Sequence, residues 1–304
     1  MNRAVVLANQ KPALTEACDT CSATDFKFLF SKDSAAGIEY GIYECARCGL
    51  VQTLPRPTEE ELEECYGAHY FQRRTDRGYD NYFSDAMRTQ LQKVWDMNLQ
   101  DVGFFQFEKL CLDGPGARAL DVGCASGFFV DYLNRRGWQA EGIELSQAAA
   151  GFGMDELGLT IHVQDFLDFQ PSEPYDFISL WASIEHLRSP LQAMRKISAM
   201  LRPGGMLVLS TCRWGLLSRS LGPSWRFLNV PEHLFYFSRS NLVHLARQFD
   251  LKEVGSITYG SGFTAFKGMG FFYRTAKALA DRAVKFVGLG DMMVYAFRKD
   301  TIER

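Results

Sequence analysis

The sequence has no apolar run long enough to cross a membrane, and its N-terminus lacks the apolar stretch and cleavage site of a signal peptide. It also lacks an excess of basic residues, since 33 Lys and Arg stand against 36 Asp and Glu, for a net charge of −3. A chain with this balance has no overall positive field to attract nucleic acid. We therefore expect a cytoplasmic protein with reduced cysteines and no nucleic-acid partner.

The length and composition allow a full-sized core. A chain of 304 residues can hold one large domain and a small one. Hydrophobic residues make up 47% of it and aromatic residues 13%, which is ample for a packed interior.

Residues 118–127 carry the most informative pattern. A short apolar run ends at Asp121, and Gly123, Ala125 and Gly127 follow at alternate positions. Glu144 ends a second apolar run, 23 residues after Asp121. This order of strand, small-residue turn, helix, strand and acid is typical of a nucleotide-binding α/β sheet. The small residues let the backbone approach a ligand closely, and the second acid can accept both ribose hydroxyls of a nucleoside.

The same segment lacks the fingerprint of a dinucleotide site. Counted from Gly123, that fingerprint needs small residues at 125 and 128, but position 128 is Phe. Asp121 would repel a pyrophosphate, whereas it suits a zwitterionic ligand that carries an ammonium group. The segment resembles motif I of the class I S-adenosylmethionine (SAM) methyltransferases, with Ala125 in place of the usual middle glycine.

Further motifs of that family follow in order between about 117 and 299. Asp165 and its neighbour Phe166 match the pair that holds the adenine, and Glu185-His186 resembles the Glu-His turn after the fourth strand. An apolar face at helical spacing predicts a helix over 190–200, and Pro-Gly-Gly at 203–205 precedes a predicted strand at 206–210. The resemblance implies a doubly wound, mostly parallel seven-stranded sheet with an antiparallel last strand.

The resemblance also implies a set of cofactor-binding residues. We expect S-adenosylmethionine to contact Asp121, Gly123, Ala125, Gly127, Glu144, Leu145, Asp165, Phe166, Trp181, Tyr79 and Tyr82. The two tyrosines belong to an N-terminal segment of a kind that commonly folds over the cofactor in this fold. They face either the cofactor or the acceptor, or they only pack the N-terminal module against the sheet.

Four of the eight cysteines form two pairs, Cys18 with Cys21 and Cys45 with Cys48. Two C-x-x-C pairs separated by 23 residues fit one tetrahedral zinc site made of thiolates. Alternating aromatic residues between the pairs predict a hairpin. We interpret 14–56 as a zinc ribbon with one structural zinc; the alternatives are chance spacing and redox disulfides.

The charge balance of the ribbon argues against a role in binding RNA. Residues 1–57 contain six Lys and Arg and six Asp and Glu, so the module has no electrostatic footprint for phosphate. We expect it to cover or complete the mouth of the active site. The predicted organisation is a zinc ribbon at 1–57, a helical connector and lid at 58–115, and the SAM-binding methyltransferase domain at 116–304. Within the connector, we expect helices at 58–66 and at about 84–111.

The segment beyond the fifth strand contains Glu232 and His233 in an aromatic stretch. Loops at the carboxyl ends of strands four and five face the methyl donor in this fold, so His233 can act as a general base. His186 is the second candidate, and either histidine could instead order loop backbone. Ser238 or Ser240 is expected to cap a helix over 240–248.

The zinc module, the methyltransferase core and Pro-Glu-His-Leu at 231–234 together resemble a bacterial family that includes sugar C-methyltransferases. That resemblance places Glu232 and His233 at the acceptor site, although Asn229 and Val230 stand where the family has a tyrosine. Glu185-His186 is also similar to quinone-biosynthesis O-methyltransferases, some of which bind a divalent metal there. Ala182 occupies the place of the further carboxylate of that metal site.

The last part of the chain has an amphipathic pattern over 267–287, with cationic residues beside the apolar face. Such a helix covers the core, closes over a pocket or lies on an anionic membrane. A final edge strand is expected at 292–297. We expect a SAM-dependent methyltransferase that acts on a small polar metabolite, either a nucleotide-linked sugar or a phenolic intermediate. The alternatives are an RNA base methyltransferase and a non-catalytic SAM-binding protein.

Overall fold

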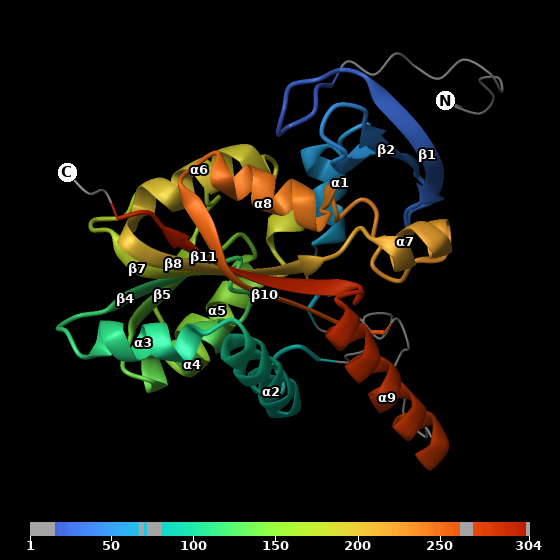
Figure 1. The fold of residues 1–304 in the computed structure, drawn as a ribbon. Helices are drawn as coiled ribbons and strands as arrows, with labels where there is room; N and C mark the ends of the chain where they lie inside the picture. The colour runs from blue at the N-terminus through green and yellow to red at the C-terminus, as the bar shows by residue number, and fades with distance from the viewer. Residues whose placement is uncertain (1–15, 67–69, 72–80, 262–269, 302–304) are drawn as a thin grey trace.

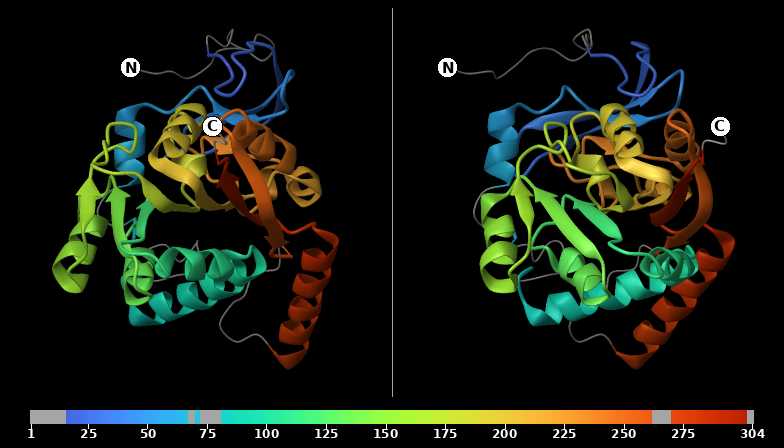
Figure 2. Two further views of the ribbon diagram at one scale, coloured as in Figure 1. Left: turned by 60° about the vertical axis from the view of Figure 1, so that its left-hand side comes forward. Right: turned by 90° about the vertical axis from the view of Figure 1, so that its left-hand side faces the viewer.

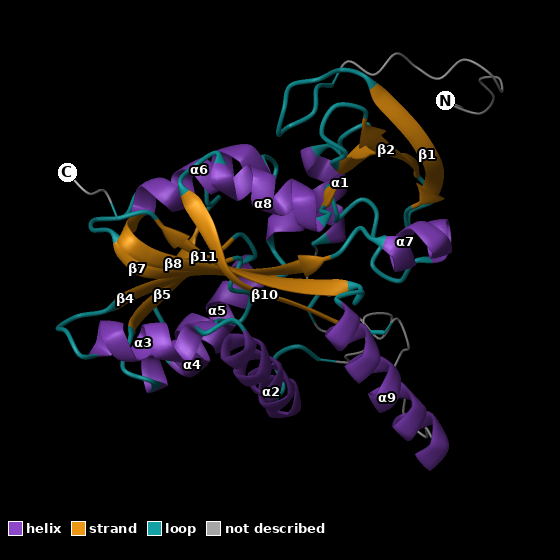
Figure 3. Cartoon of the chain, in the orientation of Figure 1, coloured by secondary structure: helices purple, strands orange, loops and turns teal. Residues whose placement is uncertain are grey.

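The computed structural model describes residues 16–66, 70–71, 81–261 and 270–301, which form two sheets (Figures 1 and 3). The larger sheet has seven strands, and the smaller one has four. No helix among these residues is long and apolar enough to span a membrane.

The seven-stranded sheet has the topology that the motif resemblance implies. Its strands, in spatial order, are β10 (Leu251–Tyr259), β11 (Met292–Lys299), β8 (Leu201–Cys212), β7 (Tyr175–Trp181), β4 (Arg118–Val122), β5 (Gln139–Glu144) and β6 (Ile161–Val163). The five strands from β8 to β6 are parallel, and β11 is antiparallel to both of its neighbours. The order reverses between β4 and β7, so the carboxyl ends of these strands form the crevice in which ligands bind in such sheets.

Helices cover both faces of this sheet (Figures 1 and 2). One face carries α6 (Pro190–Met200) and α8 (Arg239–Arg247), and the other carries α2 (Asp85–Asp101), α3 (Phe104–Leu112), α4 (Phe128–Arg135) and α5 (Gln147–Leu157). The helices expected over 190–200 and 240–248 are confirmed, and Ser238 caps the second of these.

Two sequence predictions about this domain are wrong. The single helix expected over 84–111 is broken, because Gly103 has a φ of +77° and a left-handed residue cannot continue a right-handed helix. The strand expected at the edge, β11, lies between β8 and β10. It pairs with a strand on each side, and its residues Val294 to Phe297 are no more than 1% exposed because both faces of the sheet are covered there, whereas Val254 on the edge strand β10 is 53% exposed.

The four-stranded sheet joins the N-terminal module to the domain of the seven-stranded sheet. Its order is β1 (Phe26–Asp33), β2 (Glu39–Cys45), β3 (Val51–Leu54) and β9 (Phe235–Tyr236). The first three strands come from the predicted ribbon, but β9 follows Glu232 and His233 directly. The ribbon and the predicted acceptor segment therefore share one sheet.

The remaining elements lie between the strands along the chain. They are α1 (Glu59–Cys65), α7 (Leu216–Leu221), α9 (Phe271–Val287) and two single 3₁₀ turns at Ile184–His186 and Gly222–Ser224. The helix expected at 58–66 is present as α1, and Thr58 caps it: its side chain accepts a hydrogen bond from the Glu61 backbone, and the Glu61 side chain accepts one from the Thr58 backbone.

Candidate active site

The turn after β4 has the backbone shape that close approach to a ligand requires. Gly123 and Gly127 both have positive φ values, +72° and +76°. A Cβ on Gly123 would lie 2.7 Å from the Ser183 side chain, and one on Gly127 would lie 2.6 Å from Leu159. Ala125 also has a positive φ, +49°, at the position where related turns carry glycine. Only the smallest side chains fit this turn.

Glu144 is held beside the turn by backbone donors. Its carboxylate accepts hydrogen bonds from the Ala125 N–H at 2.9 Å and the Ser146 N–H at 2.8 Å. Burial nevertheless raises the pKa of Glu144 above its usual value. Each oxygen keeps lone-pair capacity for a further donor such as a ribose hydroxyl, so the predicted role of Glu144 is sterically and chemically reasonable.

Asp121 lies below the same turn and is fully buried. It accepts a hydrogen bond of 2.7 Å from the Ser179 hydroxyl, yet burial raises its pKa to about 7. A buried carboxyl with one neutral donor and a second acid nearby gains from a cationic ligand. This arrangement fits the ammonium-bearing ligand that the sequence predicts.

The other predicted cofactor residues lie in different surroundings. Leu145 is 64% exposed beside Glu144, and the Asp165 carboxylate accepts a hydrogen bond of 2.7 Å from the Leu167 N–H. The Phe166 side chain is only 3% exposed and packs in the core, which leaves little of its ring for an adenine. Trp181 packs against Phe129 and Trp95.

The lid tyrosines can be placed only in part. Tyr82 stacks on Phe128, the first residue of α4, at 6.2 Å between ring centroids. Tyr82 therefore lies against the helix that leaves the glycine turn. Tyr79 lies outside the described residues.

An acid and imidazole cluster lies at the carboxyl ends of β7 and β8. One carboxylate oxygen of Glu185 and one ring nitrogen each of His186 and His233 lie within 4.8 Å of one another. The centroids of the two imidazoles are 4.7 Å apart. Ser183, which packs against Gly123, precedes Glu185 by two residues and donates a hydrogen bond to the Val122 carbonyl. The predicted cofactor turn and this cluster are thus adjacent parts of one crevice.

Tyr66 belongs to this cluster, although the sequence did not single it out. Its hydroxyl lies 2.8 Å from His186 Nδ1, and the Glu232 carbonyl oxygen lies 2.9 Å from the same nitrogen. Burial raises the pKa of Tyr66 well above its usual value. The available signal was the run of tyrosines after α1, but nothing local shows which of them meets a histidine 120 positions away.

His233 is held through both its ring and its backbone, and its ring nitrogens lie beside Cys212 Sγ and the Asn229 amide. Its carbonyl accepts a hydrogen bond of 2.7 Å from the Thr53 hydroxyl of the ribbon, and its N–H donates to the Asn229 carbonyl at 2.7 Å. The next residue, Leu234, donates to the Glu185 carbonyl at 2.9 Å. The ribbon and the turn after β7 are therefore both hydrogen-bonded to the backbone of the segment that carries the imidazole.

Glu185 is a second group that the sequence left without a definite role. It is 1% exposed, and one of its carboxylate oxygens has no hydrogen-bond partner among the described residues. Burial raises its pKa to about 7. A buried, unsatisfied carboxyl beside two imidazoles is a typical functional group. The three side chains can exchange protons with a substrate, or they can offer one carboxylate and two imidazole ligands to a divalent cation.

The four paired cysteines converge as the spacing predicts. The Sγ atoms of Cys18 and Cys48 are 3.5 Å apart, as are those of Cys21 and Cys45, and all four lie within 4.8 Å of one another. All four are free thiols. Sulfur atoms around a tetrahedral zinc lie roughly 3.8 Å apart, as Zn–S bonds of about 2.3 Å require. The donor set and its size fit zinc.

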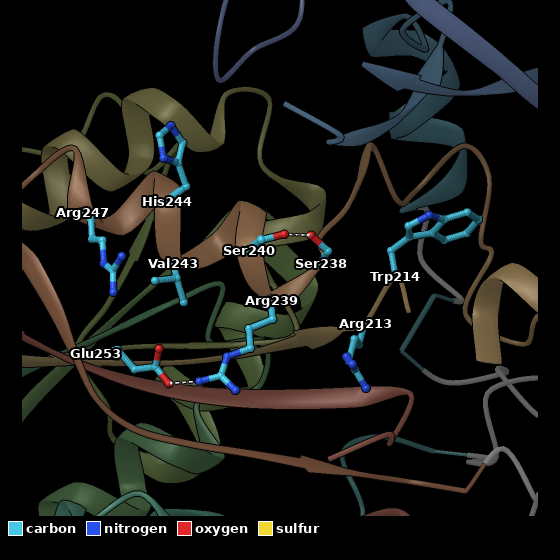
Figure 4. A pocket seen from close by; sticks show the side chains of 9 residues that line it. All are labelled: Arg213, Trp214, Ser238, Arg239, Ser240, Val243, His244, Arg247 and Glu253. Atoms are coloured by element: carbon cyan, nitrogen blue, oxygen red, sulfur yellow. Dashed lines mark hydrogen bonds and ion pairs between the residues drawn. The ribbon is translucent and has the colours of Figure 1, made fainter. Parts of the chain in front are cut away.

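A separate groove lies between α8 and β10 (Figure 4). It is lined by Arg213, Trp214, Ser238, Arg239, Ser240, Val243, His244, Arg247 and Glu253. Arg239 reaches across it to form an ion pair of 3.0 Å with Glu253. The groove contains none of the residues predicted to bind the cofactor or the acceptor.

Solved structures with the same fold include a SAM-dependent methyltransferase from Archaeoglobus fulgidus. It is 13% identical, the match covers 77% of this chain and all of that one, and the TM-score is 0.52. The cyclase SpnF is 19% identical, with 81% and 97% coverage and a TM-score of 0.53. At these identities the likeness concerns the fold alone, and the second structure shows that the fold hosts other reactions.

Curated relatives include a ubiquinone biosynthesis O-methyltransferase from Xanthomonas campestris, 32% identical over 104 residues. That match covers 32% of this chain and 44% of the relative, so the chain spans less than half of its length. One from Burkholderia thailandensis is 27% identical over 161 residues, which is 48% of this chain and 69% of the relative. The family model of the methyltransferase domain matches residues 76–254. Because this match covers more than half of the chain, the protein belongs to the methyltransferase domain family.

Proposed function

We propose that the protein transfers the methyl group of S-adenosylmethionine to a small polar acceptor. The observation that carries this proposal is the contact between the predicted donor site and the acid and imidazole cluster. Gly123 packs on Ser183, and Glu185 and His186 follow on the same 3₁₀ turn. A donor held by Glu144 would place its reactive end toward residues that can bind and deprotonate an acceptor.

The residues of this crevice have separable roles in the proposal. When bound, S-adenosylmethionine supplies a methyl group that is electrophilic because the sulfonium is positively charged. Glu144 holds the ribose, Asp121 favours the ammonium group, and the backbone of the small-residue turn allows close approach. His233 takes a proton from the acceptor, with Glu232 orienting either the imidazole or the substrate.

The acceptor is proposed as a hydroxyl-bearing metabolite, either a nucleotide-linked sugar or a phenolic intermediate. Glu232 and His233 match the pair of the sugar C-methyltransferases, whereas the similarity to ubiquinone biosynthesis O-methyltransferases supports a phenol. SAM turnover on a panel of nucleotide sugars, phenols and RNA tests both. Turnover on RNA alone would favour the rival RNA methyltransferase, and tight SAM binding without turnover would favour a non-catalytic protein.

We also propose that one zinc ion bound by the four ribbon cysteines stabilises the N-terminal module. Four thiolates close the coordination sphere, so the metal has no open position for a substrate water. Its role is therefore in folding. The predicted acceptor segment contacts the ribbon through the pairing of β3 with β9 and through the Thr53 hydrogen bond to the His233 carbonyl. Both contacts depend on that fold.

Replacing Glu144 with alanine should weaken SAM binding by about 1.5 to 3 kcal/mol, the usual scale for hydrogen bonds to a charged group. Isothermal titration calorimetry on the purified protein measures this. Glu144→Gln is the matched control, because it keeps an oxygen that can accept from the Ala125 N–H. Tight NAD binding without SAM binding would exclude the proposed donor.

SAM binding should tighten between pH 5.5 and 7. The Asp121 pKa of about 7 means that the ligand-free site is largely protonated at pH 5.5. A cationic ligand favours the carboxylate, so affinity should rise by at most about 10-fold per pH unit and level off above pH 7. Because the folded-state pKa is raised, the protonated carboxyl favours folding at low pH, and this contribution is lost as pH rises through 7.

Asp121→Asn tests the origin of this dependence. Titrations at several pH values should give a flat profile over the same range for the variant. A slope equal to that of the parent protein would assign the proton to another group.

A further inference from the structure

Helix α9 lies on the carboxyl edge of the sheet, where the candidate active site lies. It connects β10 to β11. The residues of these strands that pair nearest to the helix are Tyr259 and Met292. Met292 in turn pairs with Cys212, the last residue of β8, whose Sγ lies 3.8 Å from His233 Nδ1. From this edge the helix extends away from the body of the protein (Figures 1 and 2).

One face of α9 presents large apolar side chains to solvent. Phe272, Leu279 and Phe286 are 87%, 59% and 92% exposed, and Val287 is 57% exposed. The first three are spaced seven residues apart, so they form a line along the helix. The two phenylalanines are the most exposed large apolar residues in the part of the chain that the structure describes. The face does not cover the core.

The same helix concentrates positive charge. Arg274, Lys277, Arg282 and Lys285 stand against a single acid, Asp281, which gives the helix a charge of +3 in a chain of net charge −3. Lys277 pairs with Asp281 and Lys285 pairs with Asp101 of α2, on the side of the helix away from the apolar line. The helix is therefore apolar on one side and cationic on much of the rest.

We propose that α9 docks the protein on the surface of an anionic lipid bilayer, with Leu279 and Phe286 inserted among the lipids. A helix of 17 residues is roughly 25 Å long and would lie in the plane of the interface rather than across it. A second copy of the chain fits less well, because it would cover the apolar line and leave the cationic residues of α9 without an anionic surface. An anionic surface matches both the charge and the apolar line.

This docking does not rest on the proposed methyl transfer, but it has a consequence for it. Since α9 joins the sheet beside Cys212 and His233, a docked helix would hold the acceptor side of the crevice near the bilayer. Acceptors at the membrane surface would then lie close to the entrance of the site.

Co-sedimentation with large unilamellar vesicles tests the proposal. The full chain should bind vesicles of phosphatidylglycerol and phosphatidylcholine at low salt, and binding should fall as salt is raised. Phe286→Ser should lower the partition coefficient by about 10-fold or more, the scale expected for one large apolar side chain. Leu110→Ser is the matched control, because Leu110 on α3 is 72% exposed on another surface and should not affect binding.

The double variant Arg274→Glu, Arg282→Glu separates the charge contribution to vesicle binding from the apolar contribution. This variant should lose most of the binding to anionic vesicles. Circular dichroism of each variant checks that the helix and fold persist. The proposal is overturned if the chain binds neither vesicle type, if pure phosphatidylcholine binds it equally well, or if Phe286→Ser behaves like Leu110→Ser. A concentration-dependent dimer that Phe286→Ser abolishes, without vesicle binding, would assign this face to a second copy.

Discussion

His233→Ala should lower methyl-transfer turnover about 100-fold or more, the usual scale for losing a general base, while SAM affinity stays nearly unchanged. The imidazole is 5% exposed and lies in the acid and imidazole cluster, next to the crevice that holds the predicted donor site. Its backbone contacts with Thr53 and Asn229 do not involve the side chain. The variant therefore removes the base and keeps the loop.

His186→Ala is the control for this prediction, because His186 is the competing base. Its Nδ1 lies beside the Tyr66 hydroxyl and the Glu232 carbonyl, whereas the ring nitrogens of His233 lie beside Cys212 Sγ and the Asn229 amide. Steady-state rates with the true acceptor distinguish the two. Full turnover in His233→Ala with loss in His186→Ala would reverse the assignment, and full turnover in both would mean that the enzyme works by alignment alone.

Divalent-metal chemistry at the same cluster predicts a different pattern. If Glu185, His186 and His233 bound a cation needed for turnover, removal of any one should be rescued in part by excess metal. A simple base cannot be rescued in this way. Rate measurements with and without added Mg²⁺ or Zn²⁺ therefore separate the two chemistries.

The sequence predicts the parts of this fold that have local signatures. The turn at 123–127 is recognisable because positive φ values and close contacts demand small residues there. The C-x-x-C pairs are recognisable because a metal needs donors at fixed spacing. The capping residues Thr58 and Ser238 are recognisable because the first turn of a helix leaves N–H groups without partners.

The parts that the sequence does not predict depend on contacts between distant segments. The break at Gly103 interrupts an otherwise helical apolar pattern, and beside it the Val102 backbone packs so closely on β10 that a Cβ on Gly255 would lie 2.8 Å from the Val102 carbonyl. Pairing of β3 with β9 joins residues more than 180 positions apart. Tyr66 likewise contacts a residue that is distant in the sequence, His186. Nothing in the local pattern of either segment identifies its partner.

The four-stranded sheet connects the ribbon to the predicted acceptor segment. Val51 pairs with Tyr236 and Gln52 pairs with Phe235, so the end of the acceptor segment is held as a strand by its pairing with β3. Asn241 on α8 also donates a hydrogen bond to the Cys48 carbonyl, within the predicted zinc site. The predicted metal site is thus connected to His233 through the β3–β9 pairing and the Thr53 hydroxyl.

Cys21→Ser should therefore remove both the zinc and most of the turnover. Structural zinc contributes roughly 10 to 16 kcal/mol to the folding of small modules that depend on it, so losing one thiolate should unfold the ribbon. Without β3, the backbone of His233 loses its Thr53 partner. We expect turnover to fall by about 100-fold, comparable to loss of the base itself, while the seven-stranded sheet persists and SAM binding changes little.

Three measurements check this expectation together. Metal analysis should give one zinc per chain in the parent protein and none in the variant. Hydrogen exchange should rise over 16–54 and 232–236 and stay unchanged over β4 and β5, since those strands hold the donor site. Cys111→Ser is the matched control, because Cys111 lies outside the four-thiol cluster and should leave zinc and turnover intact. A metal-free protein with an ordered, disulfide-bonded ribbon, or a zinc-free variant with full turnover, would contradict the link between metal and base.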